Sequence, residues 1–408
     1  MLEHVALKEA WEIILNNCTA PKTEKADLLT SVNRVLAEDI YAGIDLPPFD
    51  RSPLDGYALR SSDTNDAGDD NPVRLKIIEK VAAGYMAAKK VAPGTAIKIM
   101  TGAPIPNGAD VVIKFEDTEE DNGSVMIFKP LKGNSNIVRA GEDVKQGEKL
   151  IERGTVLSYG EIGIMAAQGK DKVTVYRKPR VAVISTGDEL KDIGETLGPG
   201  KIYNSNLYTV GAAVLESGGV PVLMGAVPDT IDGSMDRIKD ALDRADIILT
   251  TGGVSVGDYD VVKEVFKGIG AELLFWRIAM KPGTPAVCAR KGEKLLIGLS
   301  GNPAAALVTY ELIVRPLIYK LSGRKNYMPQ KMAAVMEDDF TKKSCQRRFL
   351  RANVSIKDGT AYASLTGKQN PGVMKSIMGC NALIDVMPSG IIKKGDWANI
   401  ILLDKTRF

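Results

Sequence analysis

The segment Ala245–Asp260, which reads ADIILTTGGVSVGDYD, predicts the fold of the central part of the chain. It begins with the apolar run Ile247–Leu249, which is typical of a buried parallel strand. Gly252 and Gly253 follow as a turn, and a helix is expected after them. Open α/β sheets bind their ligands where a strand ends in such a turn. We therefore expect an anionic ligand held with a hard metal ion, and the alternative is a plain tight turn.

The surrounding sequence alternates in the same way from Pro179 to Gly323. Apolar runs such as Val181–Ile184 and Leu295–Leu299 are separated by segments with helical periodicity. This alternation predicts a doubly wound, mostly parallel α/β sheet with its strand-end loops on one edge. A long helix is expected over Asn302–Leu321, with Asn302 as its N-cap and Pro303 at its first position.

The remaining sequence predicts three further domains around this sheet. The N-terminal region contains two expected helices, Leu2–Asn17 and Lys25–Asn33, and returns after the insertion of a β-rich segment. Short apolar runs separated by turn residues predict a small all-β domain at the C-terminal end. The expected boundaries are 1–45 with 148–178 for an elongated helical and extended linker domain, 46–147 for the inserted β-rich domain, 179–326 for the α/β domain and 327–408 for a C-terminal small β-barrel domain.

Composition and charge exclude several functional classes. With 44% hydrophobic and 25% charged residues and a net charge of +2, the chain is typical of a soluble globular protein and not of a dedicated nucleic-acid binder. The sequence contains neither a signal peptide nor an apolar run long enough to cross a membrane. The four cysteines are dispersed, which favours free thiols in the cytoplasm. The only histidine, His4, is near the N-terminus, so histidine-dependent catalysis is not expected.

Acidic and basic residues gather at the predicted strand ends. Glu189, Asp229 and Asp260 offer oxygen ligands for a divalent cation, and Lys281 offers a positive charge for an anionic ligand. Each residue also has a simpler explanation. Asp229 is suited to cap the helix that follows it, Asp258 and Asp260 to the first turn of a helix, Glu189 to a surface turn, and Lys281 to a solvated bulge.

Two turn-rich loops in the inserted domain are also unusual. The loop Leu46–Ala58 contains three prolines in seven positions together with Asp50 and Asp55, and Thr101–Asp110 is similarly rich in turn residues. Prolines make a loop stiff, so a carboxylate on it is held in place at a low cost in entropy. The alternative is that these loops only separate β elements.

Taken in order, seven segments resemble the MoeA family of molybdopterin molybdenumtransferases, to which the E domains of gephyrin and of its plant counterpart also belong. Together they cover nearly the whole chain, and the ordered set is specific. They are Pro48–Ala58 (PFDRSPLDGYA), Met100–Pro106 (MTGAPIP), Ser185–Leu190 (STGDEL), Tyr203–Asn206 (YNSN), Thr251–Asp260 (TGGVSVGDYD), Met280–Pro285 (MKPGTP) and Gly298–Pro303 (GLSGNP).

The resemblance implies a function in molybdenum cofactor biosynthesis. Members of the family insert molybdate into adenylated molybdopterin and release AMP in a Mg²⁺-dependent reaction. The family implies an α/β domain similar to MogA and MoaB, and an adenylyltransferase of that type as a partner. It also implies a homodimer whose active site lies between the α/β domain of one subunit and loops of the other. The protein is expected to be cytoplasmic and to bind neither a nucleic acid nor a membrane.

The resemblance also assigns roles to residues by position. The implied catalytic residues are Asp55, Thr101, Glu189, Asp229 and Asp260, and the last three are also the implied ligands of Mg²⁺. The implied substrate-binding residues are Gly252, Gly253, Ser255, Lys281, Gly283, Ser300, Asn302, Pro303, Arg348 and Arg351.

Two departures from the family pattern concern anion binding. Thr284 replaces a lysine that many bacterial members have, and Pro371 replaces a serine associated with the oxyanion site. Pro371 has neither a hydroxyl nor an N–H group, so arginines such as Arg347, Arg348 and Arg351 are expected to compensate. The alternatives are a weakened or tungstate-preferring paralogue, a non-catalytic dimeric scaffold like the gephyrin E domain, and a hydrolase of nucleotides or sugar phosphates.

Overall fold

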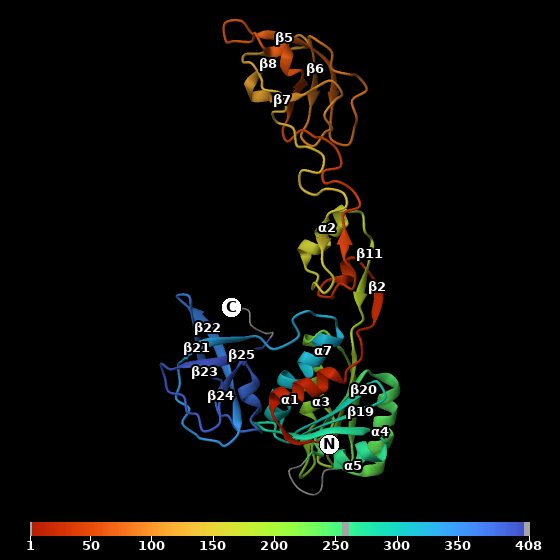
Figure 1. The fold of residues 1–408 in the computed structure, drawn as a ribbon, viewed down its shortest axis with the longest axis vertical. Helices are drawn as coiled ribbons and strands as arrows, with labels where there is room; N and C mark the ends of the chain where they lie inside the picture. The colour runs from red at the N-terminus through yellow and green to blue at the C-terminus, as the bar shows by residue number, and fades with distance from the viewer. Residues whose placement is uncertain (1, 255–260, 404–408) are drawn as a thin grey trace. The chain divides into compact units, whose positions relative to one another are not determined.

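A computed structural model describes residues 2–254 and 261–403 of the chain. The chain forms two compact units (Figure 1). Unit 1 contains Met1–Glu38, Gly154–Ser158 and Lys172–Phe408, and unit 2 contains Asp39–Arg153 and Tyr159–Asp171. The finer division into four domains stays a prediction.

The α/β part of unit 1 contains a seven-stranded sheet in the order β1-β17-β19-β20-β16-β12-β15. The strands β20, β16, β12 and β15 are parallel to one another, whereas β19 is antiparallel to both of its neighbours. This confirms the prediction of a doubly wound, mostly parallel sheet. The strands are β1 (Leu2–Val5), β12 (Arg180–Thr186), β15 (Val220–Val227), β16 (Ile247–Thr251), β17 (Glu272–Ile278), β19 (Ala286–Lys291) and β20 (Lys294–Leu299).

Helices cover both faces of this sheet (Figure 1). Apolar side chains of α1, α3, α6 and α7 pack in the core on one face, and those of α4 and α5 pack on the other. Burial on both faces explains why β16 begins with the apolar run Ile247–Leu249 and does not alternate. The helices are α1 (Leu7–Asn16), α3 (Ser205–Glu216), α4 (Ile231–Arg244), α5 (Val261–Gly268), α6 (Pro303–Thr309) and α7 (Arg315–Leu321).

The N-terminal region differs from the prediction of two helices. Leu2–Val5 is a strand that pairs in parallel with β17, and the helix begins at Leu7. The second expected helix is replaced by β2 (Thr23–Asp27), which pairs antiparallel with β11 (Lys172–Tyr176), and by a short 3₁₀ helix at Leu29–Ser31. These strands form hydrogen bonds with partners far away in the sequence. The stabilisation from these hydrogen bonds outweighs the local helix propensity of the two segments.

The predicted long helix after β20 is one helical run with an irregular middle. A π-helical turn, Tyr310–Val314, connects α6 to α7. It places Glu311 and Arg315 on the same side of the helix, where they form a buried ion pair. Apart from the π-helical turn, the run matches the prediction over Asn302–Leu321.

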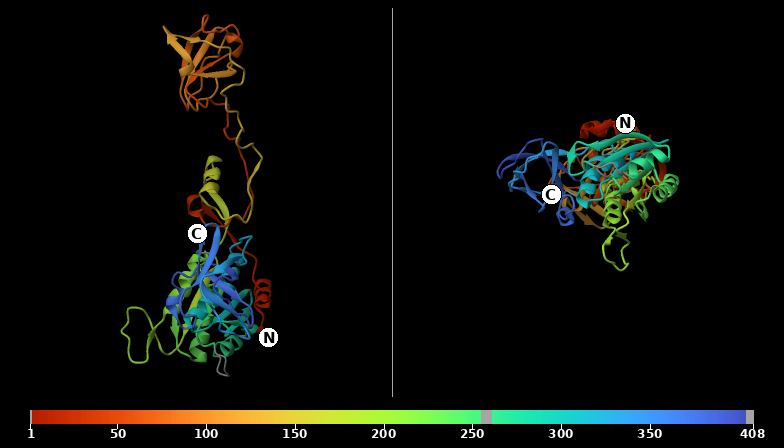
Figure 2. Two further views of the ribbon diagram at one scale, coloured as in Figure 1. Left: turned by 90° about the vertical axis from the view of Figure 1, so that its left-hand side faces the viewer. Right: turned by 90° about the horizontal axis from the view of Figure 1, so that it is seen from below.

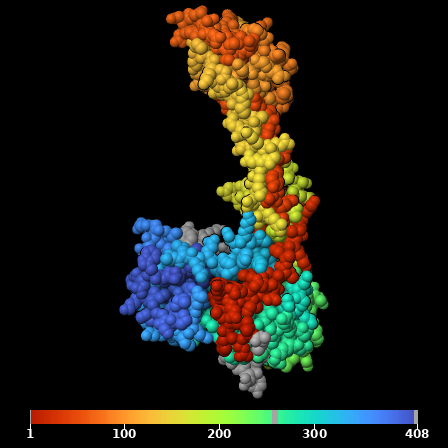
Figure 3. All heavy atoms as spheres, in the orientation of Figure 1, coloured from red at the N-terminus to blue at the C-terminus, as the bar shows by residue number. Residues whose placement is uncertain are grey.

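The C-terminal part of unit 1 is a closed five-stranded barrel, which confirms the predicted small β-barrel. Closure comes from the pairing of β22 with both β23 and β24. The segment 322–330, which precedes β21, runs over the surface toward the barrel (Figure 3). The strands are β21 (Lys331–Met336), β22 (Arg347–Lys357), β23 (Thr360–Leu365), β24 (Ala382–Val386) and β25 (Trp397–Leu402), and a 3₁₀ helix covers Met374–Ile377.

Unit 2 is β-rich, as the sequence predicts. Its six-stranded sheet has the order β7-β4-β6-β5-β9-β8, and β3 (Ile40–Tyr41) pairs separately with β10 (Lys149–Ile151). The helix α2 (Tyr159–Ala167) belongs to the same unit. The strands of the sheet are β4 (Gly56–Leu59), β5 (Val73–Val81), β6 (Thr95–Ile99), β7 (Val111–Lys114), β8 (Thr118–Asp121) and β9 (Ser124–Ile127), with 3₁₀ helices at Ser61–Thr64 and Phe115–Asp117.

A long loop of unit 1 carries residues near the candidate site. It begins after β12, forms the short pair β13 (Leu190–Lys191) and β14 (Ile202–Tyr203), and extends away from the sheet between them (Figure 2). Within the described ranges, no helix is long and apolar enough to cross a membrane.

Candidate active site

Three strand-end loops meet at one edge of the parallel sheet. The register aligns Ser185 with Thr251 and Thr251 with Leu299, so β12, β16 and β20 end at the same level. Gly252 then passes so close to β12 that an added Cβ would lie 2.3 Å from the carbonyl oxygen of Thr186. Only glycine permits this approach, because the φ of Gly252 is also +90°. The glycine turn therefore has a structural function, whether or not it also binds a ligand.

Asp229 lies at this edge among other carboxylates. Partial burial is the largest cause that raises the pKa of Asp229, although much of its surface is exposed. The hydroxyl of Thr186 opposes the rise, and the negative charges of Glu189 and Asp188 add to it. The backbone N–H of Asp229 also donates a weak hydrogen bond to Asp188 Oδ1 at 3.4 Å. The structure thus brings Asp229 and Glu189 together, and it adds Asp188, which the sequence did not single out.

Glu189 folds back over the turn that precedes it. An added Cβ on Gly187 would lie 2.6 Å from Glu189 Oε2, so the carboxylate lies directly against this turn. Lys201, from the other end of the long loop, donates a hydrogen bond to the carbonyl oxygen of Asp188 at 2.7 Å. The long loop therefore closes on itself next to Glu189, where the N–H of Ile202 donates to the Glu189 carbonyl oxygen at 2.9 Å.

The donor set is suited to a hard cation but is incomplete in the described residues. Across 2–254 and 261–403, no group of three or more His, Cys, Asp or Glu residues is arranged to hold a metal ion. Asp260 and Ser255 lie outside the described residues. The mutual repulsion of Asp229, Glu189 and Asp188 is the feature that a divalent cation would relieve.

The start of α6 lies beside the same edge. Pro303 occupies the first helical position, as predicted, but the side chain of Asn302 makes no capping hydrogen bond. The backbone N–H of Asn302 is instead bonded to Ser300 Oγ at 3.2 Å, and the N–H of Ala304 donates to the carbonyl oxygen of Pro371 at 3.0 Å. The loop of the barrel that carries Pro371 thus satisfies this helix terminus.

A second feature joins the α/β part to the barrel. The short strand β18 (Met280–Lys281) pairs in parallel with β22, so Lys281 lies opposite Arg348. Both residues line a groove of about 500 Å³, together with Lys342, Lys368 and the chain up to Pro371. We call it the Lys281 groove. Four basic side chains around one groove favour an anionic ligand.

The three arginines expected to compensate for Pro371 lie in different environments. Arg347 forms a paired salt bridge with Asp385 and is engaged there. Arg351 is 1% exposed and does not line the Lys281 groove. Arg348 lines it, with its guanidinium 5.5 Å from the ring centre of Phe340 and a buried Nε that has no hydrogen-bond partner among the described residues. Of the three, Arg348 is therefore the one placed to contact an anion in the groove.

Gly283 is placed beside this groove by backbone geometry. Its φ is +98°, and an added Cβ would lie 2.2 Å from the hydroxyl oxygen of Thr309. Thr284, at the position of the missing lysine, donates a hydrogen bond to the carbonyl oxygen of Met280 at 2.6 Å. Both residues therefore fix the shape of the turn after Lys281.

Asp55 and Thr101 form a separate contact within unit 2. Asp55 Oδ1 accepts hydrogen bonds from the backbone N–H of Thr101 at 2.6 Å and from its hydroxyl at 2.8 Å. These two bonds lower the pKa of Asp55, with the backbone bond the larger cause. Although Asp55 is exposed, its carboxylate is held in one orientation, as expected for a stiff loop.

Three family models match successive parts of the chain. The MoeA N-terminal region (domain I and II) matches residues 5–169, a probable molybdopterin binding domain matches 182–320, and the MoeA C-terminal region (domain IV) matches 333–403. A molybdopterin molybdenumtransferase of Staphylococcus aureus (strain Mu50 / ATCC 700699) is 38% identical over 402 residues, which is 98% of this chain and 96% of that protein. The chain belongs to the MoeA family.

Other relatives agree with this assignment. A molybdopterin molybdenumtransferase of Bacillus subtilis (strain 168) is 40% identical over 375 residues, which is 90% of this chain and 86% of that protein. The crystal structure of a molybdopterin biosynthesis MoeA protein from Pyrococcus horikosii has a TM-score of 0.87 and 33% identity, and the match covers 98% of this chain and 99% of that one. This MoeA-family chain is therefore an enzyme of molybdenum cofactor biosynthesis.

Three residues near the candidate sites were not predicted from the sequence. Asp188 directly precedes Glu189, and Lys342 and Lys368 come from separate turns of the barrel. For Asp188 the acidic pair itself was a usable signal. Nothing in the local sequence distinguishes the two lysines from other surface lysines, because only closure of the barrel brings them to Lys281.

Proposed function

We propose that this enzyme inserts molybdate into adenylated molybdopterin and releases AMP in a Mg²⁺-dependent reaction. Membership of the MoeA family supports the class of reaction. One observation supports the placement of the substrates: the strand register puts Lys281 opposite Arg348. Both residues belong to the same unit as the carboxylates at the sheet edge.

In this proposal molybdate binds in the Lys281 groove. Molybdate is a tetrahedral dianion, and two cations held side by side by backbone pairing form a preorganised site for it. Lys342 and Lys368 add positive charge from the barrel side. These lysines compensate in part for Thr284, which offers no positive charge at the position of the family lysine.

The phosphate end of adenylated molybdopterin binds at the sheet edge. Gly252 and Gly253 allow the ligand to approach the backbone closely, and Gly301 lies beside Gly252, with an added Cβ only 3.3 Å from Gly252 Cα. Ser300, Asn302 and Pro303 form the neighbouring wall at the start of α6. Asp229, Glu189 and Asp260 are the proposed ligands of Mg²⁺, which when bound would neutralise negative charge on the phosphate oxygens.

The proposal also includes a homodimer and a donor enzyme. The carboxylate of Asp55 of the partner subunit, oriented by Thr101, contributes to the active site, as the family resemblance implies. A MogA/MoaB-type adenylyltransferase supplies the adenylated substrate. Sedimentation of the purified protein tests the dimer independently of activity, because a dimer requires twice the mass of the 43.9 kDa chain.

The direct test is release of AMP from adenylated molybdopterin in the presence of molybdate and Mg²⁺. Wild type is expected to release AMP, and Asp229→Asn is expected to lower the rate at least about a hundredfold, because it removes a proposed metal ligand. Asp236→Asn is the matched control, since Asp236 is exposed on α4 and pairs only weakly with Lys239. If wild type and Asp229→Asn release AMP at the same rate, the proposed mechanism is wrong.

The alternatives give different results in the same assay. A tungstate-preferring enzyme would release AMP faster with tungstate than with molybdate. A non-catalytic scaffold would release none with either oxyanion, although it would still form the dimer. A simple phosphoesterase would hydrolyse nucleotides that lack the dithiolene group.

A further inference from the structure

A side chain outside the residues assigned to the reaction connects two segments at the sheet edge. Asn206, in the first turn of α3, donates a hydrogen bond from Nδ2 to the carbonyl oxygen of Gly301 at 2.8 Å. The two residues are 95 positions apart in the chain, and Gly301 lies in the loop between β20 and α6. We call this contact the Asn206 link.

Gly301 lies directly against the glycine turn that follows β16. An added Cβ on Gly301 would lie 3.3 Å from Gly252 Cα and 3.8 Å from Gly252 N. The N–H of Gly252 in turn donates a hydrogen bond to the carbonyl oxygen of Leu299 at 3.2 Å. A movement of Gly301 would therefore displace the turn at which the substrate phosphate is proposed to bind.

The other end of the link is held beside the acidic loop. Asn204 is 2% exposed and caps α3, because its Oδ1 accepts a hydrogen bond from the N–H of Leu207 at 3.2 Å. The N–H of Asn204 donates to the carbonyl oxygen of Lys191 at 2.8 Å, in the strand that directly follows Glu189. The start of α3 is therefore a fixed base from which Asn206 reaches the other loop.

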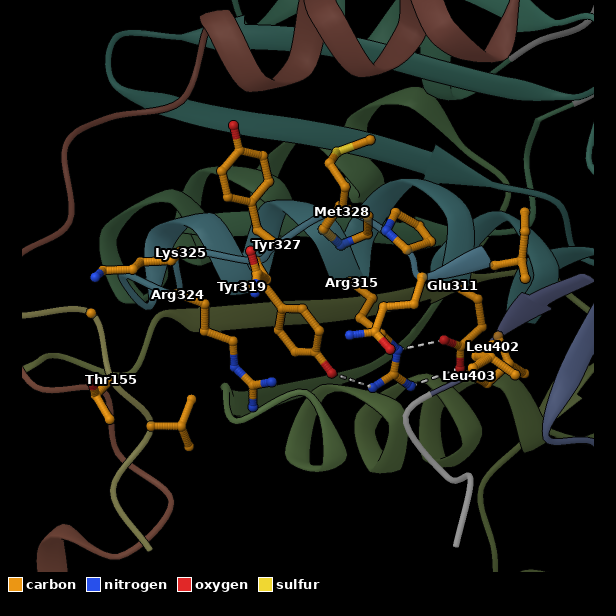
Figure 4. A pocket seen from close by; sticks show the side chains of 17 residues that line it. Thr155, Glu311, Arg315, Tyr319, Arg324, Lys325, Tyr327, Met328, Leu402 and Leu403 are labelled. Atoms are coloured by element: carbon orange, nitrogen blue, oxygen red, sulfur yellow. Dashed lines mark hydrogen bonds and ion pairs between the residues drawn. The ribbon is translucent and has the colours of Figure 1, made fainter. Parts of the chain in front are cut away.

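The helical run after the Gly301 loop is anchored independently. Glu311 binds Arg315 through both carboxylate oxygens, and these residues are 3% and 5% exposed (Figure 4). This buried pair lines a separate cavity beside α7. On the other side of the loop, β20 is paired with both β16 and β19. Because the strand and the helical run are both fixed, the position of Gly301 depends on contacts of the loop itself.

Stability alone does not account for an asparagine at position 206. Its Oδ1 is buried and accepts no hydrogen bond from the described residues, and such an unpaired acceptor lowers stability. Gly301 is exposed, so water can replace Asn206 as the donor to its carbonyl oxygen. An apolar side chain of similar size would avoid the buried acceptor. The N–H group of Asn206 is therefore the part of the side chain that needs a functional explanation.

We propose that Asn206 is a positioning residue that holds the Gly252–Gly253 turn in the geometry that binds the phosphate of adenylated molybdopterin. Asn206 acts through Gly301 and does not itself contact the substrate. This inference rests on the proposed function, in which the phosphate binds at this turn. Neither Asn206 nor Gly301 lines the Lys281 groove, so binding of molybdate does not depend on the link.

Calorimetric titration of the full-length protein with AMP, which carries the phosphate of the proposed substrate, tests the link without turnover. Asn206→Leu is expected to weaken AMP binding about tenfold, because it removes the hydrogen bond but keeps the volume. Asn353→Leu is the matched control, since Asn353 also donates from Nδ2 to a glycine carbonyl, that of Gly379 at 2.9 Å, but in the barrel. Weaker AMP binding in both variants, or in neither, would overturn the proposal.

Thermal unfolding of the same variants separates positioning from a purely structural role. Asn206→Leu also removes the buried Oδ1, so its melting temperature is expected to equal or exceed that of wild type. A second variant, Asn206→Ala, keeps the test valid if leucine does not fit, and it should lose the same AMP affinity. If affinity falls only in variants whose melting temperature falls with it, the link is structural and the proposal is wrong.

Steady-state kinetics distinguish this inference from the proposed function. Asn206→Leu is expected to lower kcat/KM for adenylated molybdopterin at least about tenfold and to leave the KM for molybdate unchanged. If wild type releases AMP but the variant changes both parameters alike, this inference is wrong and the proposed function stands. If wild type neither binds nor releases AMP, the proposed function is wrong, and this inference fails with it.

Discussion

Arg351 donates a hydrogen bond from Nε to Ser376 Oγ at 2.7 Å, and each of the two residues is only 1% exposed. The same guanidinium donates to the carbonyl oxygens of Lys368 and Asn370, both at 3.2 Å. Lys368 and Asn370 line the Lys281 groove, whereas Arg351 does not. The hydrogen bonds of Arg351 therefore position the loop that borders the groove. A direct contact between Arg351 and the substrate stays a prediction.

The first prediction concerns this buried arginine. Arg351→Ala is expected to lower the free energy of unfolding by roughly 3 kcal/mol, because it leaves two carbonyl oxygens and a hydroxyl without their donor. Calorimetric or denaturant unfolding measures the loss. Arg290→Ala is the control, since Arg290 forms an exposed pair with Glu272 and is expected to cost no more than about 1 kcal/mol. Equal stability of the two variants would contradict a positioning role for Arg351.

The second prediction concerns the glycine turn of the sheet edge. Gly252→Ala is expected to destabilise the protein by roughly 3 kcal/mol or more, because it combines a left-handed backbone with a clash against the Thr186 carbonyl. Gly218→Ala separates the two effects. Gly218 has a φ of +80° but no atom within 4 Å of an added Cβ, so it should cost only about 1–2 kcal/mol. Thermal unfolding of the pair measures the contribution of the close contact.

The third prediction concerns the pH dependence of Asp55. Its pKa is lowered by the bonds from Thr101, so this contact stabilises the loop above the ordinary pKa of about 3.9 and is lost as the pH falls through the lowered value. Thr101→Val removes the hydroxyl bond but keeps the backbone bond, and the pKa of Asp55 should rise toward 3.9. NMR titration of the carboxylate carbon measures it. Thr101→Ser keeps both donors, so a similar rise in that variant would show that the hydroxyl is not the cause.

The fourth prediction rests on the proposed function and concerns Pro371. Its carbonyl oxygen caps α6, and any residue can supply that group. Pro371→Ser should therefore keep the loop in place while it adds a hydroxyl to the Lys281 groove, and the KM for molybdate should fall severalfold in the AMP-release assay. Pro371→Ala is the control without a hydroxyl. If both variants behave alike, the hydroxyl does not contribute to binding of the oxyanion.

Much of the fold could be predicted because the relevant signals are local. Apolar runs such as Ile247–Leu249 predicted the parallel strands, and Pro303 predicted the start of α6. The strand Leu2–Val5 was missed because its hydrogen bonds go to β17, far away in the sequence. Asn302 is the N-cap residue, as predicted, but its side chain makes no capping hydrogen bond, and the Pro371 carbonyl from the barrel accepts a bond from the first turn instead.

The sequence by itself determined the family, the alternation of strands and helices, and the acidic and glycine residues at the strand ends. Those features depend on residue type and spacing along the chain. Only the tertiary structure decided that Lys281 lies opposite Arg348, that Arg351 is buried beneath a loop, and that Arg324 stacks on Tyr319. These relationships depend on strand register and on the packing of the barrel against the sheet, and side-chain burial is fixed only when distant segments come together.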